Sequence, residues 1–439
     1  MFFHNSFNYV RARHLHLISI EMLAIILAVW FCWRLKKEKR LTLEIAYFIA
    51  LPFSDVPFRF ASVQPVEFIS FLVVLFNYKQ IKPIWLLVLG GLFVFFSVLG
   101  FTTHTGGDVY SLLYSFRFVL TGLVFSIFTQ RAPGLPLDVL RFVVSLCFWM
   151  TFLQVFLWLA GLPIHGIFYD PSVGAFPRAK GLAQEPATWS IFILMLFPFI
   201  HHFKLPRKYL TMNYITLFIT LSTFGFICIA SYLLIRWCLH GGWVNLKLWK
   251  KITAFGVAIF VFLSVLFPGA IHYTDILLDG FVKVEYYAYE LSTFAGFHIL
   301  SKPHGMATGN SGRNSDLIML KENFPHNQLF GIGSFKADSD AIRQEGVNAT
   351  NTYIGWIVEV GIVGTILVFV LLYLHYSVLF KNYRLKSPDF LAGALNMFLM
   401  ISGIRCFSFH EIWYTQGYVL RTAISENNPL PSNEKIDAE

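Results

Sequence analysis

Two basic side chains and a carboxylate stand close together, directly before a long apolar stretch. The segment reads Arg178-Ala-Lys180-Gly181-Leu-Ala-Gln-Glu185-Pro186. An arginine keeps its charge and can pair with two phosphate oxygens at once, and a carboxylate can take a proton from a hydroxyl group. Side chains of these types would suit the binding of a phosphate ester and the transfer of a group from it.

The same segment also fits a purely structural role, which the composition alone favours. Pro186 suits the first turn of a helix, where its missing N–H would have no partner. Glu185 would then interact with the positive end of that helix. Arg178 would lie at a membrane surface with its stem among apolar groups.

A second group of candidate residues lies in a polar interval, residues 271–351, between two apolar stretches. Intervals of this length in compact proteins are uncommon and are usually functional or disordered. This one contains aromatic and aliphatic residues at intervals, so it can fold. Its densest part starts at Arg313, where residues 313–323 have the spacing of a short amphipathic helix.

The glycines at 331 and 333 predict a tight turn after this helix. A phosphate-binding loop would need further glycines or a following Lys-Ser/Thr, so we interpret Gly331 and Gly333 as a structural turn. His326 lies just before the turn and is, with Glu185, a candidate general base. A lone histidine beside a turn is more often a structural residue.

No metal site or redox centre is indicated. The histidines His298, His304 and His326 lack the spacing of metal ligands, and no HExxH pattern occurs. The five cysteines are scattered, mostly within apolar stretches, where cysteine acts as a small hydrophobe. We therefore expect neither a metal nor a cofactor.

The composition predicts that membrane helices position these residues. Of the 439 residues, 56% are hydrophobic and only 13% are charged, whereas soluble domains have about 25% charged residues. Continuous apolar stretches approach the roughly 20 residues that a helix needs to cross a bilayer, and they lack the alternation of barrel strands. We expect an all-α fold, a polytopic transmembrane bundle of about 12–13 spans with one long extracytoplasmic loop that contains short amphipathic helices.

Basic residues cluster between the apolar stretches and predict the orientation of the helices. The net charge is +9, and the clusters lie at residues 34–40, 79–82, 131, 204–208, 236–251 and 381–386. Such clusters stay in the cytoplasm, so they indicate topology and not nucleic-acid binding. The interval 271–351 has six Lys or Arg against nine Asp or Glu, which agrees with an extracytoplasmic location.

The predicted spans follow from this orientation. They are residues 17–33, 41–53, 66–77, 83–101, 110–128, 139–162, 189–202, two short helices within 209–235 that meet near Ser222, then 251–267, 354–380, 390–404 and 412–424. The organisation would be an additional N-terminal span with a basic cluster (1–40), membrane helices with an outer loop at 163–188 (41–271), the long catalytic loop (272–350), C-terminal membrane helices (351–424) and a disordered cytoplasmic tail (425–439).

Three sequence patterns follow one another along the chain. They are R-x-x-G-x-x-x-E-P, then an arginine and F-x-x-N-x-L-x-G-x-G in the long loop, and then Asn-x-Tyr leading into E-x-G-I-x-G. They fall on Arg178, Gly181, Glu185, Pro186, Arg313, Phe324, Asn327, Leu329, Gly331, Gly333, Asn351, Tyr353, Glu359, Gly361, Ile362 and Gly364. In their order and spacing, these patterns resemble the O-antigen polymerase and ligase superfamily of bacterial cell envelopes. The resemblance covers residues 41–424 and leaves the first span as an addition.

The resemblance implies a metal-independent glycosyltransferase of the bacterial inner membrane that joins repeat units carried on undecaprenyl pyrophosphate. Arg178 and Arg313 would bind the diphosphate, and Glu185 or His326 would act on the acceptor hydroxyl. Substrate contacts would come from Lys180, Gly181, Asn327, Gly331, Gly333, Asn351 and Tyr353. The partners would be the lipid-linked oligosaccharide, the lipid bilayer and a chain-length-regulating protein.

Two alternatives remain open. The family often has His-Asn where this chain has Thr350-Asn351, and in ligases, which transfer glycan to lipid A core, that histidine is the expected catalytic group. Its absence favours a polymerase, whose product could be O-antigen, capsule or exopolysaccharide. The other alternative is a flippase or transporter, because Glu21 and Arg117 lie within predicted spans, although the sequence indicates neither paired repeats nor broken helices.

Overall fold

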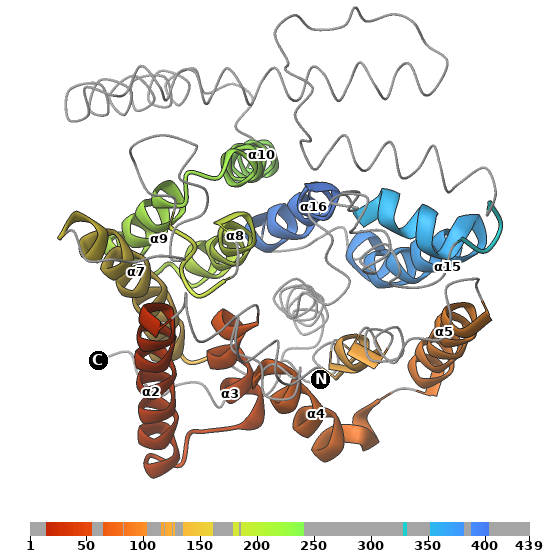
Figure 1. The fold of residues 1–439 in the computed structure, drawn as a ribbon, viewed down its shortest axis with the longest axis horizontal. Coiled ribbons are helices and arrows are strands. Elements are labelled where there is room, and N and C mark those ends of the chain that lie inside the picture. The colour runs from red at the N-terminus through yellow and green to blue at the C-terminus, as the bar shows by residue number, and fades with distance from the viewer. Residues whose placement is uncertain are drawn as a thin grey trace, which may run out of the picture.

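The structure is a computed structural model, and its described residues are 15–54, 65–81, 83–102, 116–117, 119–124, 126–127, 135–160, 179–183, 186–240, 328–331, 352–381 and 388–403. Every regular element within these ranges is a helix (Figure 1). The prediction of an all-α fold is confirmed for this part of the chain.

Most of the predicted spans correspond to a helix. The α-helices are α2 (Leu15–Lys37), α3 (Leu43–Ala50), α4 (Pro65–Asn77), α5 (Pro83–Thr102), α7 (Leu137–Leu159), α8 (Pro186–His202), α9 (Arg207–Ile219), α10 (Thr223–Leu239), α15 (Thr352–Lys381) and α16 (Pro388–Gly403), with 3₁₀ turns η1 (Leu51–Phe53) and η2 (Tyr78–Gln80). The predicted spans at 251–267 and 412–424, and the predicted helix at 313–323, lie outside the described residues.

Local signals explain where several helices begin. Helices α4, α5, α8 and α16 each start at a proline, whose fixed φ and missing N–H suit the first helical position. Ser222 caps α10, because its hydroxyl oxygen accepts a hydrogen bond from the Gly225 N–H at 3.1 Å. The predicted division of residues 209–235 into two helices near Ser222 is therefore confirmed.

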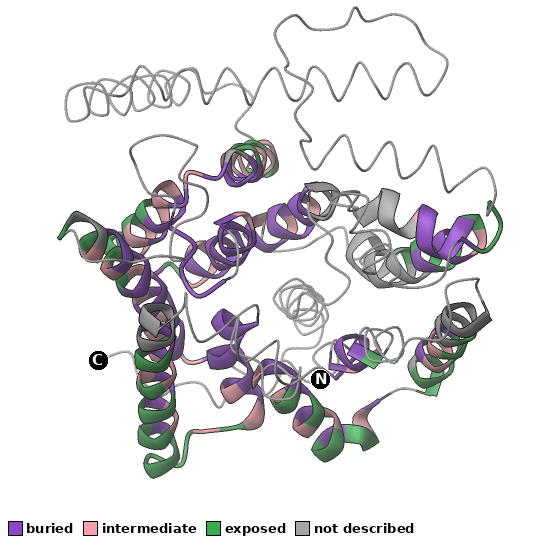
Figure 2. Cartoon of the chain, viewed as in Figure 1, coloured by how far each residue is buried: buried purple, intermediate pink, exposed green. Residues whose placement is uncertain are grey.

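Helix α8 is the centre of the described bundle. Of its 17 residues, 14 are buried, and it packs against α7, α9, α10 and α16. Figure 2 shows this helix almost entirely in the colour of buried residues. A helix that is apolar on every side is stable only when other apolar elements surround it, so α8 forms the core of the bundle.

The peripheral helices turn large apolar side chains outward. Trp30 of α2, Phe76 of α4 and Leu87 of α5 are all exposed, and Figure 2 shows exposed residues along these three helices. Among the described residues, the segment Leu137–Leu157 is long and apolar enough to cross a membrane, and the apolar helices Leu43–Phe53, Pro186–His202, Phe224–Leu239 and Ile357–Val370 are shorter. These features indicate an association with the membrane.

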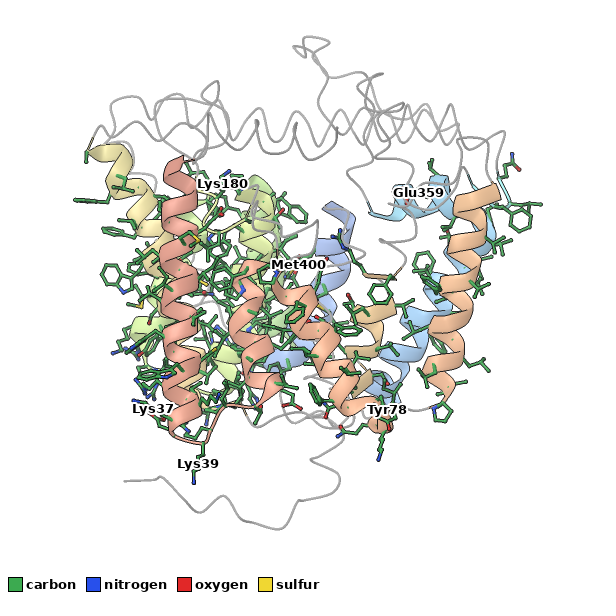
Figure 3. The ribbon with its side chains drawn as sticks, turned by 60° about the horizontal axis from the view of Figure 1, so that its bottom comes forward. Lys37, Lys39, Tyr78, Lys180, Glu359 and Met400 are labelled. Atoms are coloured by element: carbon green, nitrogen blue, oxygen red, sulfur yellow. The ribbon has the colours of Figure 1, made fainter. Side chains whose placement is uncertain are left out.

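The bundle has two chemically different ends. Lys37, Lys39 and Tyr78 lie at one end, and Lys180 and Glu359 lie at the opposite end (Figure 3). Lys37 and Lys39 belong to the basic cluster 34–40, which the sequence assigns to the cytoplasm, and Tyr78 directly precedes the cluster 79–82. Lys180 lies in the predicted outer loop 163–188, and Glu359 lies near the start of the predicted span 354–380.

Helix α15 is interrupted, which the sequence did not indicate. Gly361 has φ 64° and ψ −168°, a conformation outside the helical region, within the span Thr352–Lys381. This backbone region is accessible almost only to glycine. The expectation that the chain has no broken helix is therefore wrong, and the break lies close to Glu359, at one end of the bundle (Figure 3).

Candidate functional site

A glutamine within α7 holds the loop that follows Arg178. The Gln154 side chain is fully buried. Its Nε2 donates a hydrogen bond to the Gly181 carbonyl, and its Oε1 accepts one from the Gly181 N–H at 3.0 Å. Both polar groups of one peptide residue are thus satisfied by one side chain, as buried backbone groups require. The loop 179–183 is fixed to α7 by this contact.

Only glycine can occupy position 181. Gly181 has φ +55°, and a Cβ built there would lie 2.0 Å from Cε2 of Trp189 in α8. The indole is itself held, because Trp189 Nε1 donates a hydrogen bond to Thr151 Oγ1 at 3.0 Å. The loop therefore lies against a fixed aromatic ring with no space for a side chain.

Lys180 is buried beside the first helix. Lys180 is only 8% exposed. Its carbonyl accepts a hydrogen bond from the Ala183 N–H at 3.0 Å, which closes a tight turn. The carboxylate of Glu21, on α2, interacts electrostatically with Lys180. A buried cation needs such a counter-charge. The predicted role of Lys180 in substrate binding stays a prediction.

Besides the contact between Gln154 and Gly181, a second contact attaches the turn at residues 328–331 of the long loop to the break in α15. The Ile362 N–H donates to the Gln328 carbonyl at 2.9 Å, and the Val363 N–H donates to the Leu329 carbonyl at 3.2 Å. These donors belong to the first turn of the helical segment after Gly361, where N–H groups have no partner within the helix. The loop carbonyls supply the missing acceptors. We call residues 328–331 together with Gly361 the loop–helix junction.

Two glycines allow the junction to close. Gly331 has φ +70°, and a Cβ there would lie 2.4 Å from the Glu359 carbonyl carbon and oxygen. A Cβ on Gly361 would meet the Leu329 carbonyl at the same distance. Each glycine thus makes room for the other backbone. Residues 328–330 form a turn that is followed by Gly331, whereas Gly333, the second glycine of the predicted turn, lies outside the described residues. Glu359 is buried, at 1% exposed.

The four candidate catalytic residues, Arg178, Glu185, Arg313 and His326, lie outside the described residues, as do Asn327, Gly333 and Asn351. Along the chain, four of these seven residues directly adjoin described positions. Arg178 precedes Ala179, Glu185 precedes the first residue of α8, Asn327 precedes Gln328, and Asn351 precedes the first residue of α15. Tyr353 lies in the first turn of α15.

The structure brings some of the predicted residues together and keeps others apart. Gly331 of the long loop packs directly against Gly361 of α15, so residues from two separate sequence patterns are in contact. Lys180 and Glu359 lie at the same end of the bundle but on different sides of it (Figure 3). The loop 179–183 and the loop–helix junction are therefore two separate attachments at one end.

Several residues of this arrangement were not predicted as site residues. Gln154 holds the loop 179–183, and Thr151 holds the Trp189 ring against which that loop packs. The signal that could have found Gln154 is a polar amide within an apolar helix.

Arg117, which the sequence analysis named as a possible transporter residue, forms an ion pair with Glu67 of α4, with Nε and Oε1 2.6 Å apart. Each side chain of this pair is only 7% exposed, so Arg117 has an internal counter-charge.

No protein-family model matches the chain, and no curated protein sequence is significantly similar to it.

Replacing Gly361 with Ala should weaken the loop–helix junction. A methyl group there would overlap the Leu329 carbonyl, and a non-glycine residue in this region of φ and ψ is strained by about 1–3 kcal/mol. We expect a lower thermal unfolding temperature in detergent and faster protease cleavage within residues 332–351. Gly90→Ala in α5 is the matched control, because a Cβ there meets nothing within 4 Å. Equal behaviour of the two variants would contradict the role given to the junction.

Replacing Gln154 with Leu should leave the Gly181 N–H and carbonyl without partners in a buried site. Each unsatisfied group is expected to destabilise the protein by about 1–3 kcal/mol. Gly181→Ala disturbs the same contact through Trp189, so the effects of Q154L and G181A on unfolding temperature should be less than additive in the double variant. Fully additive effects would show that Gln154 and Gly181 act independently.

Proposed function

We propose that this chain is a polysaccharide repeat-unit polymerase of the bacterial inner membrane, built as a polytopic bundle of about 12–13 helices. It would join oligosaccharide units carried on undecaprenyl pyrophosphate at the outer face of that membrane. The observation that supports this most is the attachment of two loops to one end of the bundle, opposite Lys37 and Lys39. The loop 179–183 lies between the candidate residues Arg178 and Glu185 in the sequence, and the turn at 328–331 follows the candidate residue His326.

The proposed membrane location rests on the outer surface of the bundle. Its peripheral helices present Trp30, Phe76 and Leu87 outward, which water would disfavour and lipid chains would not. The basic residues at the opposite end from Lys180 would face the cytoplasm. Under this orientation both loops face the side on which finished repeat units are assembled.

The proposed reaction is a displacement at the anomeric carbon of the donor sugar. A hydroxyl oxygen of the acceptor repeat unit forms a bond to that carbon, and the bond from the carbon to the phosphate oxygen breaks. Undecaprenyl pyrophosphate leaves with the electron pair. The hydroxyl proton passes to Glu185 or His326 as general base. No oxidant, nucleotide or metal enters the balance.

The two arginines would act on the leaving group. As the glycosidic bond to phosphate breaks, negative charge grows on the diphosphate, and Arg178 and Arg313 would stabilise that charge more in the transition state than in the ground state. The firm attachment of each neighbouring loop matters here, because charges stabilise a transition state best when they need not be reoriented. Gln154 fixes the loop directly after Arg178, and the loop–helix junction fixes a later turn of the interval that contains Arg313.

The separation of the two attachments suits a reaction between two lipid-linked substrates. Lys180 and Glu359 lie on different sides of one end of the bundle (Figure 3). A donor and an acceptor that are both anchored in the membrane by a lipid chain need two separate binding positions at the membrane surface. A ligase that transfers glycan to lipid A core has the same need, so this feature favours the superfamily's chemistry without separating its two activities.

A transporter is the second candidate, and the break in α15 is the observation that favours it. Transporters commonly use discontinuous helices, with the break at the middle of the membrane where the substrate binds. The break at Gly361 is instead near Glu359, at the end of the bundle (Figure 3). Its backbone groups are also satisfied by Gln328 and Leu329. A polymerase therefore remains the better proposal.

Replacing Arg313 with Ala should abolish long glycan chains and leave single-repeat material, because the charge on the departing diphosphate would lose a stabilising partner. The measurement is the length distribution of the glycan in cells that produce the variant at normal level. Arg343→Ala is the matched control, since it removes an arginine of the same long loop outside the shared pattern. Normal chain lengths in the R313A strain would remove Arg313 from the mechanism.

Deletion of the gene should distinguish the polymerase from the ligase. Loss of a polymerase leaves single repeat units on the carrier lipid or on its final acceptor, because no repeat is added to another. Loss of a ligase leaves long polymer on the carrier lipid. We expect single repeats, measured by mass spectrometry of extracted undecaprenyl-linked glycan; accumulated polymer would favour the ligase instead.

A further inference from the structure

The helical segment after Gly361 has two distinct faces, and both are apolar. Its buried face contains Thr365 and Val368. Its exposed face contains large hydrophobic side chains spaced three or four residues apart, as one face of a helix requires. These are Ile362 at 40% exposed, Ile366 at 55%, Phe369 at 45%, Val370 at 48% and Tyr373 at 68%.

The turn of the long loop adds two more apolar side chains at the top of this stripe. Leu329 is 60% exposed and Phe330 is 51% exposed. Their backbone is held near the start of the stripe, because the Gln328 and Leu329 carbonyls accept hydrogen bonds from the N–H groups of Ile362 and Val363. Two large hydrophobic residues at the tip of a turn in a polar interval would be unfavourable in water.

The hydrogen bonding of the turn also suits an apolar environment. Within lipid, each backbone polar group needs a partner from the protein, since no water is available. The Gln328 and Leu329 carbonyls have such partners in α15. The turn can therefore enter the edge of the hydrocarbon region without two unpaired carbonyls, which an ordinary exposed loop could not do.

We propose that Leu329 and Phe330 insert into the acyl chains of the outer leaflet and anchor the long loop to the membrane surface. The inference rests on the proposed membrane location but not on the polymerase activity. The exposed apolar stripe of α15 begins at Ile362, whose N–H is bonded to the Gln328 carbonyl directly before these two residues, and this proximity selects bilayer lipid as the occupant. The anchor would hold the segment that contains Arg313 and His326 at the depth where a lipid-linked diphosphate lies.

Depth can be measured with a nitroxide spin label in place of Phe330. The label would be attached to Phe330→Cys in a full-length variant whose native cysteines Cys32, Cys147, Cys228, Cys238 and Cys406 are replaced by Ala. The protein would be reconstituted into vesicles of phosphatidylethanolamine and phosphatidylglycerol. Collision with oxygen, which concentrates in lipid, is then compared with collision with a water-soluble nickel chelate.

Two matched positions calibrate the measurement. Ile366→Cys reports the lipid-facing stripe of α15, and Lys39→Cys reports the aqueous surface at the basic end. We expect the label at 330 to resemble the one at 366, with high oxygen collision and loss of nickel collision. A label at 330 that behaves like the one at 39 would overturn the anchor. Dipolar broadening between labels at 330 would also overturn it, because a second copy of the chain would then cover the turn.

A charged substitution tests the consequence for the loop. Phe330→Asp should raise nickel collision at a label on Leu329→Cys and speed protease cleavage within residues 332–351 in vesicles, whereas Phe330→Leu should change neither. Equal behaviour of the two variants would contradict the anchor. If the label at 366 itself reported water, the membrane location would fail. If all labels behaved as expected while R313A made normal chains, only the polymerase would fail.

Discussion

The interruption of α15 is possible only because another segment of the chain satisfies the backbone groups that it releases. Gly361 ends the regular helical hydrogen bonding at one end of the bundle, where it is buried, and a buried N–H without a partner is strongly unfavourable. The Gln328 and Leu329 carbonyls take the place of the missing acceptors. The break and the turn at residues 328–331 therefore require each other, and this exchange holds that turn against α15.

The loop after Arg178 is attached by the same physical means with different chemistry. There the partner of the backbone is the Gln154 amide, and the close approach is to the Trp189 ring instead of another backbone. In both places a glycine with positive φ removes the side chain that would prevent contact. Along the chain, Arg178 directly precedes the first of these attachments, and His326 lies two positions before Gln328 of the second.

Sequence reasoning was most successful where the signal is local. Pro83 and Pro186 fixed the starts of α5 and α8, and Ser222 fixed the start of α10, because each acts on its own helical turn. It failed where two distant segments decide the outcome. Nothing near Gly361 distinguishes a break from a tolerated helical glycine, since the partner carbonyls are about 30 residues away in sequence. The role of Gln154 was equally hard to predict, because its hydrogen-bond partner Gly181 lies in another segment of the chain.

Helix α2 lies outside the pattern shared with the polymerase and ligase superfamily, yet it interacts with a residue of that region of the fold. The carboxyl group of Glu21, on α2, is buried and interacts electrostatically with the buried Lys180. A chain shortened past α2 would lose this carboxylate from the surroundings of a buried cation. The N-terminal segment is thus a structural member of the region around Arg178, and removal of it for expression would disturb that region before any substrate arrives.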